Sequence, residues 1–274
     1  MLSLLPILEG VIERGLLFSL VVVAVYLTSR IIKFDDLSVE GSFGIGGAVT
    51  AACLAHDISI IIALPLALLA GALTGMATGL LHTKLKLNNL MSGIIVTTGL
   101  FSIALKLASS NVGLSHATTL FTYAPHTIIV LIIISVLIAW GVLWLLHTEV
   151  GYMLYAVGSN ERILTTLGKN IDTYKIGCLM LANSITALAG SLFVQLVGYF
   201  SIWSNVGMLI IAMTGLILSE MITTHITFWS LLLGSILYQG IIAATFEFQL
   251  DPSWNKLITA LLLVALLSIK QLRK

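Results

Sequence analysis

The sequence predicts an all-α fold, a polytopic bundle of membrane-spanning helices that forms a single domain over residues 1–274. Composition is the first reason: 58% of the residues are hydrophobic and 9% are charged, whereas soluble domains carry about 25% charged residues. The mean hydropathy of +1.09 also indicates a membrane protein. The second reason is the recurrence of apolar runs of about 20 residues, the length that crosses the hydrocarbon core of a bilayer.

About nine such runs are expected to form spanning helices. Short polar segments separate most of them, so the bundle alternates between the two sides of the membrane. The net charge of +1 and the absence of a basic cluster with interleaved aromatics argue against a nucleic-acid partner. In chain order the expected spans are 12–30, 41–56, 58–82, 88–108, 126–147, 172–197, 205–222, 226–247 and 254–270.

The second expected span, 41–56, is short and rich in glycine, and an acidic-polar run precedes it at 35–40. We expect a broken backbone here. Because non-helical backbone at membrane depth requires protein or water around it, the segment should lie inside the bundle. It is then a candidate lining of a solute pathway, through Ser42 and Phe43. A small-residue face for close helix packing is an equally good interpretation.

Basic residues predict the orientation of the chain. With nine spans and a cytoplasmic 148–170 segment, the N-terminus lies outside and the C-terminus inside. Of the 13 lysines and arginines, only Arg14, Lys106 and Lys256 then fall on or near the outer side, as the positive-inside rule favours. The others fall inside or at the inner boundary: Arg30, Lys33, Lys84, Lys86, Arg162, Lys169, Lys175, Lys270, Arg273 and Lys274.

The stretch 148–170 is the one long segment that does not read as membrane. Gly151 and Gly158 are expected to bound one short helix, Ser159 or Asn160 to cap the next, and Gly168 to end it. Two short helices with exposed polar groups would form a docking surface for another protein. A simple connecting loop is the alternative.

Further pathway candidates lie on the fourth expected span and between the sixth and the seventh. Asn89 and Ser92 share a helix face, and Thr97 follows them. The same residues allow a local interpretation, in which Asn88 caps the helix and hydroxyls bond back to carbonyls. The segment from Tyr199 to Trp203 completes the set of candidate pathway residues.

The sequence lacks the residue patterns that ATP binding, metal binding and ion coupling require. Gly168-Lys169 has no glycine-rich loop before it, so the chain should not bind ATP itself. The six histidines have no metal-ligand spacing, and the two cysteines lie in apolar, small-residue segments typical of packed thiols. Glu40 and Glu220 fall near predicted inner boundaries rather than in mid-membrane, which argues against ion coupling. We expect no catalytic residues, no metal site and no cofactor in this chain.

The 148–170 stretch resembles a family signature. The run T-x-x-G-x-x-x-x-A-x-G-x-N begins at Thr148 and ends at Asn160, a Leu167-Gly168 step follows, and a small-residue span comes next at 182–192. These features are similar to the permease subunits of bacterial ABC importers for branched-chain amino acids and ribose. Residues 37–43 and 86–94 look closer still to an uncharacterised branch of this family with lipoprotein-type binding proteins, some of which take aromatic amino acids.

The resemblance implies a function and partners. The chain would be the transmembrane permease of an ABC importer in the bacterial inner membrane, a homodimer with two ATPase subunits that hold ATP and Mg²⁺, and with a periplasmic or lipid-anchored solute-binding protein. Tyr152, Met153 and Tyr155 replace residues that are often basic in the family. The implied coupling residues are Gly151, Tyr152, Tyr155, Ala156, Gly158, Asn160, Glu161, Leu167 and Gly168. An ion-coupled secondary transporter and the membrane subunit of a non-importing ABC complex are the alternatives.

Overall fold

The computed structural model describes residues 4–114, 118–122, 126–223, 226–247 and 254–272. Within these ranges, eight helices are long and apolar enough to cross a membrane, which confirms the polytopic helical bundle. The ninth expected span forms a helix of 18 residues, α11. The helices and strands are α1 (Leu4–Tyr26), η1 (Leu27–Ile31), α2 (Ser38–Ala55), α3 (Ile60–Thr83), α4 (Asn89–Ala108), β1 (Asn111–Gly113), η2 (Leu120–Thr122), α5 (Thr127–Leu146), α6 (Glu149–Ser159), α7 (Glu161–Thr166), α8 (Ile171–Val197), β2 (Tyr199–Ser201), η3 (Ile202–Asn205), α9 (Met208–Ile222), α10 (Phe228–Glu247) and α11 (Asn255–Leu272).

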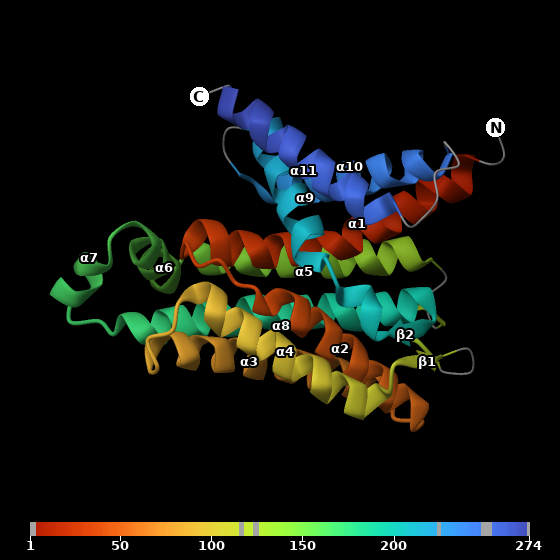
Figure 1. The fold of residues 1–274 in the computed structure, drawn as a ribbon, viewed down its shortest axis with the longest axis horizontal. Coiled ribbons are helices and arrows are strands. Elements are labelled where there is room, and N and C mark those ends of the chain that lie inside the picture. The colour runs from red at the N-terminus through yellow and green to blue at the C-terminus, as the bar shows by residue number, and fades with distance from the viewer. Residues whose placement is uncertain (1–3, 115–117, 123–125, 224–225, 248–253, 273–274) are drawn as a thin grey trace.

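The long helices form two groups that share α1 (Figure 1). In one group α2, α3, α4 and α8 pack together, and in the other α1, α9, α10 and α11 lie side by side. Helix α1 also contacts α5 and α8 and so joins the groups. The short helices α6 and α7 lie at one end of the bundle, and the two-stranded antiparallel sheet of β1 and β2 lies at the other (Figure 1).

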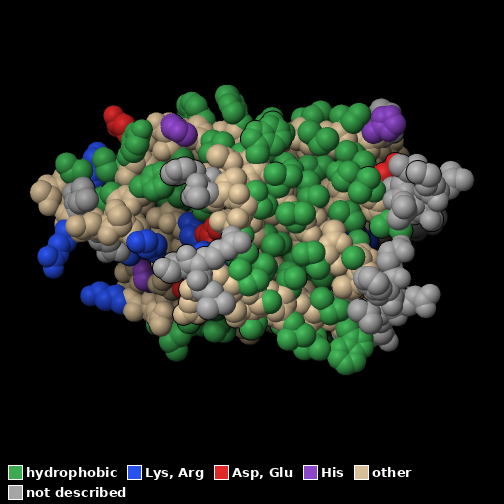
Figure 2. Space-filling view, turned by 90° about the horizontal axis from the view of Figure 1, so that it is seen from above, with side chains coloured by type: hydrophobic (Ala, Val, Ile, Leu, Met, Phe, Trp, Pro, Cys, Tyr) green, Lys and Arg blue, Asp and Glu red, His purple; other side chains and the backbone are tan. Residues whose placement is uncertain are grey.

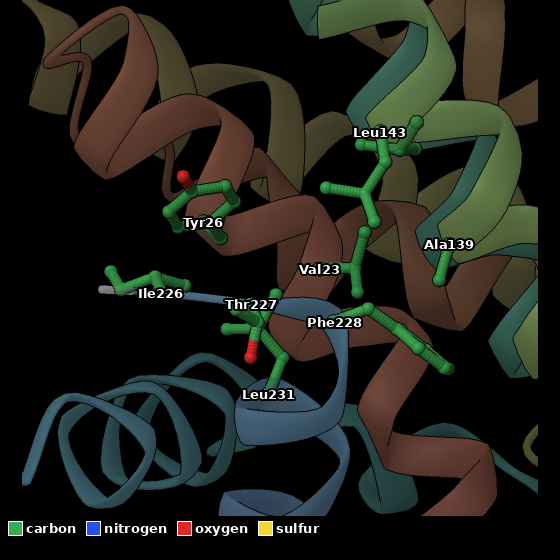
Figure 3. A pocket seen from close by; sticks show the side chains of 9 residues that line it. Val23, Tyr26, Ala139, Leu143, Ile226, Thr227, Phe228 and Leu231 are labelled. Carbon is green, nitrogen blue, oxygen red and sulfur yellow. The ribbon is translucent and has the colours of Figure 1, made fainter. Parts of the chain in front are cut away.

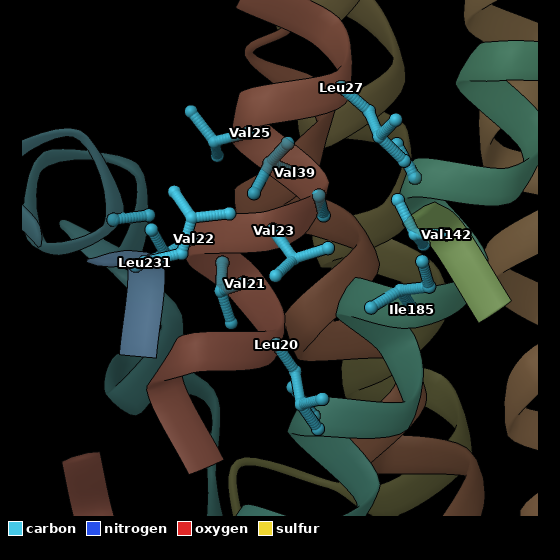
Figure 4. Packing of buried hydrophobic residues seen from close by; sticks show 14 of the residues in the cluster. Leu20, Val21, Val22, Val23, Val25, Leu27, Val39, Val142, Ile185 and Leu231 are labelled. Carbon is cyan, nitrogen blue, oxygen red and sulfur yellow. The ribbon is translucent and has the colours of Figure 1, made fainter. Parts of the chain in front are cut away.

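Helix α1 forms the centre of the hydrophobic core. Every residue from 15 to 25 is buried, because this helix is apolar on all sides and has neighbours on all sides. Figure 4 shows its valines and leucines directed toward α2, α5, α8 and α10. A helix segment buried all round fixes the positions of its neighbours, and η1, which continues α1, contacts α6.

The glycine-rich segment lies inside the bundle, as predicted. Its window is 78% buried, and a Cβ added at Gly46 or Gly190 would overlap the backbone of the facing helix, at Ala187 and Phe43 respectively. The predicted break is wrong, because α2 is continuous from Ser38 to Ala55. Close packing of small residues on α8 keeps its backbone helical, and the irregular backbone lies before it, in the π-helix η1 and residues 32–37.

Replacing Gly46 with valine should destabilise the protein, because the side chain would collide with the α8 backbone. Overpacking of this kind costs about 1–3 kcal/mol or more, and the midpoint of thermal unfolding in detergent should fall clearly. The control is Gly177→Ala, where a Cβ meets nothing within 4 Å. Equal midpoints for the two variants would contradict the close α2–α8 contact.

Candidate functional site

The first candidate site is the pair of helices α6 and α7 at the end of the bundle. Asn160 ends α6, and its Oδ1 accepts a hydrogen bond of 3.1 Å from the amide of Arg162 at the start of α7. Gly168 follows α7 with a left-handed φ of +67°. The predicted cap at Asn160 and the predicted helix end at Gly168 are confirmed. Gly151 and Gly158 do not bound a helix, however, since both lie within α6.

Helix α6 uses one face to attach to the bundle. Gly151, Leu154 and Val157 are buried, and a Cβ at Gly158 would overlap the carbonyl oxygen of Ile31 in η1. Gly158 therefore permits α6 to touch the end of the π-helix directly. Tyr155 also lies close to the hydroxyl of Tyr26 on α1.

The other face of this pair is exposed and partly apolar. Ala156 is half-buried at the boundary of the two faces, while Asn160 and Gly168 are exposed. Figure 2 shows that most of the lysines and arginines visible on this side of the molecule gather toward the same end. The sequence prediction included Glu161, which begins α7 and whose side chain lies outside the described part. The exposed large side chains are Val150 at 45%, Tyr152 at 63%, Tyr155 at 43% and Leu167 at 56%.

A charged triad ties three helices together beside α6. Arg30 Nε lies 2.5 Å from Glu220 Oε1, and Arg30 Nη2 lies 3.2 Å from Glu220 Oε2. Lys270 of α11 pairs with the same carboxylate. The sequence did not predict this triad, although all three residues lie at ends of expected spans on the same predicted side of the membrane. The triad connects η1, α9 and α11.

A buried polar network holds the irregular segment before α2. Asp36 is 3% exposed. Its Oδ1 accepts hydrogen bonds from the amide of Ser38 at 2.8 Å and from the Ser38 hydroxyl at 2.5 Å, and its Oδ2 accepts one of 2.7 Å from Nδ2 of Asn183. Asn183 Oδ1 in turn accepts from Ser42 at 2.5 Å. One amide on α8 therefore joins residues 32–37 to the first turns of α2.

The structure separates the predicted pathway residues into three places. Ser42 belongs to the buried network, and Phe43 packs between Phe18 and Phe193 with centroid distances of 6.3 and 5.5 Å. The candidates on α4 lie elsewhere, and the remaining two, Tyr199 and Trp203, line a cleft.

On α4, local hydrogen bonding explains part of the pattern. Asn88 caps the helix by accepting from the amide of Leu90 at 3.3 Å, and Ser92 donates to the carbonyl of Asn88 at 3.0 Å. Thr97 instead donates to the carbonyl of Leu37 at 2.9 Å, and Asn89 is half-buried. The local interpretation is correct for Asn88 and Ser92. Thr97 instead fixes α4 against the start of α2.

The cleft has a volume of about 620 Å³. Residues from α1, α2, α8, α9, α10 and α11 line it together with β2 and η3, and they include Arg14, Glu40 and Lys256. The sequence placed Glu40 near the inner boundary and the two cations on or near the outer side. Because residues 32–37 fold back into the bundle, Glu40 instead shares one cleft with both cations, and that prediction is wrong.

A second, much smaller recess lies between α1, α5 and the start of α10 (Figure 3). Its volume is about 10 Å³, and mainly apolar side chains such as Val23, Leu143 and Phe228 line it. This space holds about one water molecule, so it is a packing defect rather than a ligand site. Among the described residues, no group of three or more His, Cys, Asp or Glu side chains could hold a metal ion.

The comparisons with known proteins agree on one family. Residues 7–267 match the family described as branched-chain amino acid transport system / permease component. A tyrosine transport system permease protein of Clostridioides difficile is 34% identical over 265 residues, which cover 94% of this chain and 90% of that protein. The ribose import permease protein RbsC of Escherichia coli K12 is 28% identical over 177 residues, 61% of this chain and 53% of that protein. No solved structure matches the chain significantly.

Replacing Asn183 with leucine should destabilise the protein strongly. The change removes the amide partner of both Asp36 and Ser42, and each buried polar group left unpaired costs about 1–3 kcal/mol. Thermal unfolding in detergent measures the loss. Ser184→Ala is the control, because that hydroxyl bonds within its own helix, to the carbonyl of Met180. An Asn183→Leu variant as stable as the control would contradict the role of the network.

Proposed function

Because the chain belongs to the branched-chain amino acid transport system permease family, we propose that it is the membrane permease subunit of a bacterial ABC importer. Two copies form the pathway for a small solute, and two separate ATPase subunits drive it. ATP and Mg²⁺ belong to those subunits. Helices α6 and α7 are the docking site for the ATPase and transmit its movement to the bundle.

The proposal rests on the difference between the two faces of α6, one packed tightly against the bundle and one exposed. One face contacts η1 so closely that Gly158 has no room for a side chain. The opposite face exposes Tyr152, with Leu167 exposed just after α7. Exposed aromatic side chains on a rigid support are typical anchors of protein interfaces. A plain connecting loop would require neither the tight attachment nor the exposed anchors.

Charge supports a cytoplasmic position for this end. Arg30, Lys84, Arg162 and Lys169 belong to η1, the end of α3 and the α6–α8 region, and Arg14 and Lys256 line the cleft toward the other end. By the positive-inside rule this charge distribution supports an inner-membrane orientation with the N-terminus outside and the C-terminus in the cytoplasm. A periplasmic or lipid-anchored binding protein would deliver the solute at the outer end.

The relative from Clostridioides difficile is a tyrosine transport system permease protein, which supports an amino acid as the solute. The relative named for ribose covers less of the chain at lower identity. We therefore propose an amino acid or a related small solute as the transported compound.

Two carboxylates within the bundle, Asp36 and Glu40, bear on the alternative of an ion-coupled transporter. The Asp36 carboxylate accepts hydrogen bonds from Ser38 and Asn183, and that of Glu40 accepts one of 3.0 Å from the amide of Gly207. Both therefore have structural partners. Uptake by the chain alone in liposomes, without nucleotide or other subunits, would favour the ion-coupled alternative over the ABC permease.

Combining Tyr152→Ala with Leu167→Ala should disrupt docking of the ATPase. Truncating interface anchors costs about 2 kcal/mol or more, so ATPase binding and ATP-driven uptake should fall by at least about 10-fold. Affinity for the partner ATPase and solute uptake in reconstituted vesicles measure this. Ile61→Ala is the control, because this side chain is also exposed, at 78%, and lies in the first turn of α3 rather than in the α6–α7 pair. Full coupling in the double variant would overturn the docking site.

Reporter fusions should establish the orientation. Green fluorescent protein fused after residue 274 should fluoresce, since it folds in the cytoplasm, and alkaline phosphatase at the same position should be inactive. The same reporters placed before residue 1 should give the opposite pattern. An active phosphatase at the C-terminus would contradict both the orientation and the cytoplasmic position of α6 and α7.

A further inference from the structure

The cleft at the outer end carries charges of both signs on different helices. Arg14 comes from α1, Glu40 from α2 and Lys256 from α11. Lys256 is close enough to Glu40 to act electrostatically on its carboxylate. Charged groups in membrane proteins are costly and mark ligand pathways by default. A cleft with two cations and one anion can bind a ligand that itself has both charges.

The Glu40 carboxylate is held in place from the protein side. Glu40 Oε1 accepts a hydrogen bond of 3.0 Å from the amide of Gly207 at the start of α9. The backbone carbonyl of Glu40 accepts one of 3.4 Å from Nδ2 of Asn205. A carboxylate can accept about four hydrogen bonds, so this anchored group still has capacity for an ammonium. It is a positioned acceptor rather than a mobile surface charge.

The rest of the cleft wall is largely apolar and aromatic. Phe18, Phe193, Tyr199 and Trp203 line it, and Trp203 is 66% exposed. An edge contact with Phe101, at a centroid distance of 6.1 Å, supports the indole. Volumes of about 300–1,000 Å³ and apolar walls with few polar groups are typical of small-molecule sites, and 620 Å³ falls within that range.

We propose that this cleft binds a zwitterionic α-amino acid with an aromatic or large apolar side chain. Glu40 accepts its ammonium, Arg14 and Lys256 bind its carboxylate, and the aromatic wall covers its side chain. The inference rests on the proposed function, since it assigns a solute site to the permease itself. It adds a selective step in the membrane to the selection made by a binding protein.

A phosphatidylethanolamine headgroup shares this chemistry, because it also joins an ammonium and an anion to an apolar body. Full-length protein should therefore be reconstituted in nanodiscs of phosphatidylcholine, which lacks a primary ammonium. Equilibrium binding of radiolabelled L-tyrosine is then measured without ATP or partner subunits. Mass spectrometry of the purified protein records any retained phosphatidylethanolamine.

Two analogues test the two charges separately. Tyramine lacks the carboxylate, and 3-(4-hydroxyphenyl)propionate lacks the ammonium. Each should bind at least about 10-fold more weakly than L-tyrosine, because each loses a hydrogen bond to a charged group. Equal affinity of all three compounds would overturn the proposal, and this comparison requires no variant protein.

Variants then assign the charges to residues. Glu40→Gln should lower L-tyrosine affinity by about 10-fold or more and leave the affinity for 3-(4-hydroxyphenyl)propionate unchanged. Arg14→Gln combined with Lys256→Gln should have the opposite selectivity and spare tyramine. Asp35→Asn, an exposed carboxylate five positions from Glu40, is the control and should bind all three compounds like the wild type.

The outcomes separate this inference from the proposed function. Absence of L-tyrosine binding, or Glu40-dependent retention of phosphatidylethanolamine in its place, would overturn the solute site. If ATP-driven uptake by the complete complex persists in that case, the permease function stands. If the analogues bind as expected but uptake requires no ATPase, the site stands and the ABC assignment is wrong.

Discussion

The side-chain amide of Asn183 is the interaction on which the rest of the bundle depends. It binds Asp36 and Ser42 at once, and so holds a non-helical segment within the protein. Extended backbone inside a membrane bundle is tolerated only where protein satisfies its polar groups. Ile32 and Phe34 donate to carbonyls of η1, and Thr97 donates to the carbonyl of Leu37. Because these bonds meet the condition and Asn183 pairs the Asp36 side chain, α2 can start inside the bundle.

The depth at which α2 starts determines both candidate sites. Residues 32–37 return from the end of η1, where α6 is attached, and lead to Glu40 in the outer cleft. A hairpin that turned at the membrane surface would have left Glu40 near the cytoplasm. The same six residues therefore connect the α6 attachment with the cleft, and the glycines of α2 and α8 let the helix pack without a gap.

Sequence periodicity and composition were sufficient for the helices but not for this fold-back. Apolar runs locate the spans, and Asn160 and Gly168 mark the ends of α6 and α7, because local chemistry sets these features. Asp36 and Asn183 are 147 positions apart, and no local pattern pairs them. For the same reason the sequence placed Glu40 away from Arg14 and Lys256, did not reveal the Arg30–Glu220–Lys270 triad, and grouped α4 residues with Tyr199 and Trp203 as pathway candidates.

The contacts of η1 indicate how movement at α6 would reach the cleft. Gly158 lies against Ile31, and Arg30 beside it is paired with Glu220 on α9. Helix α9 begins directly after Gly207, whose amide donates to the Glu40 carboxylate. A displacement of η1 would therefore have two routes to the same carboxylate, along residues 32–40 and along α9. Because residues 15–25 of α1 are buried on all sides, such a displacement would be expressed at the cleft, where Glu40 and Arg14 come from different helices.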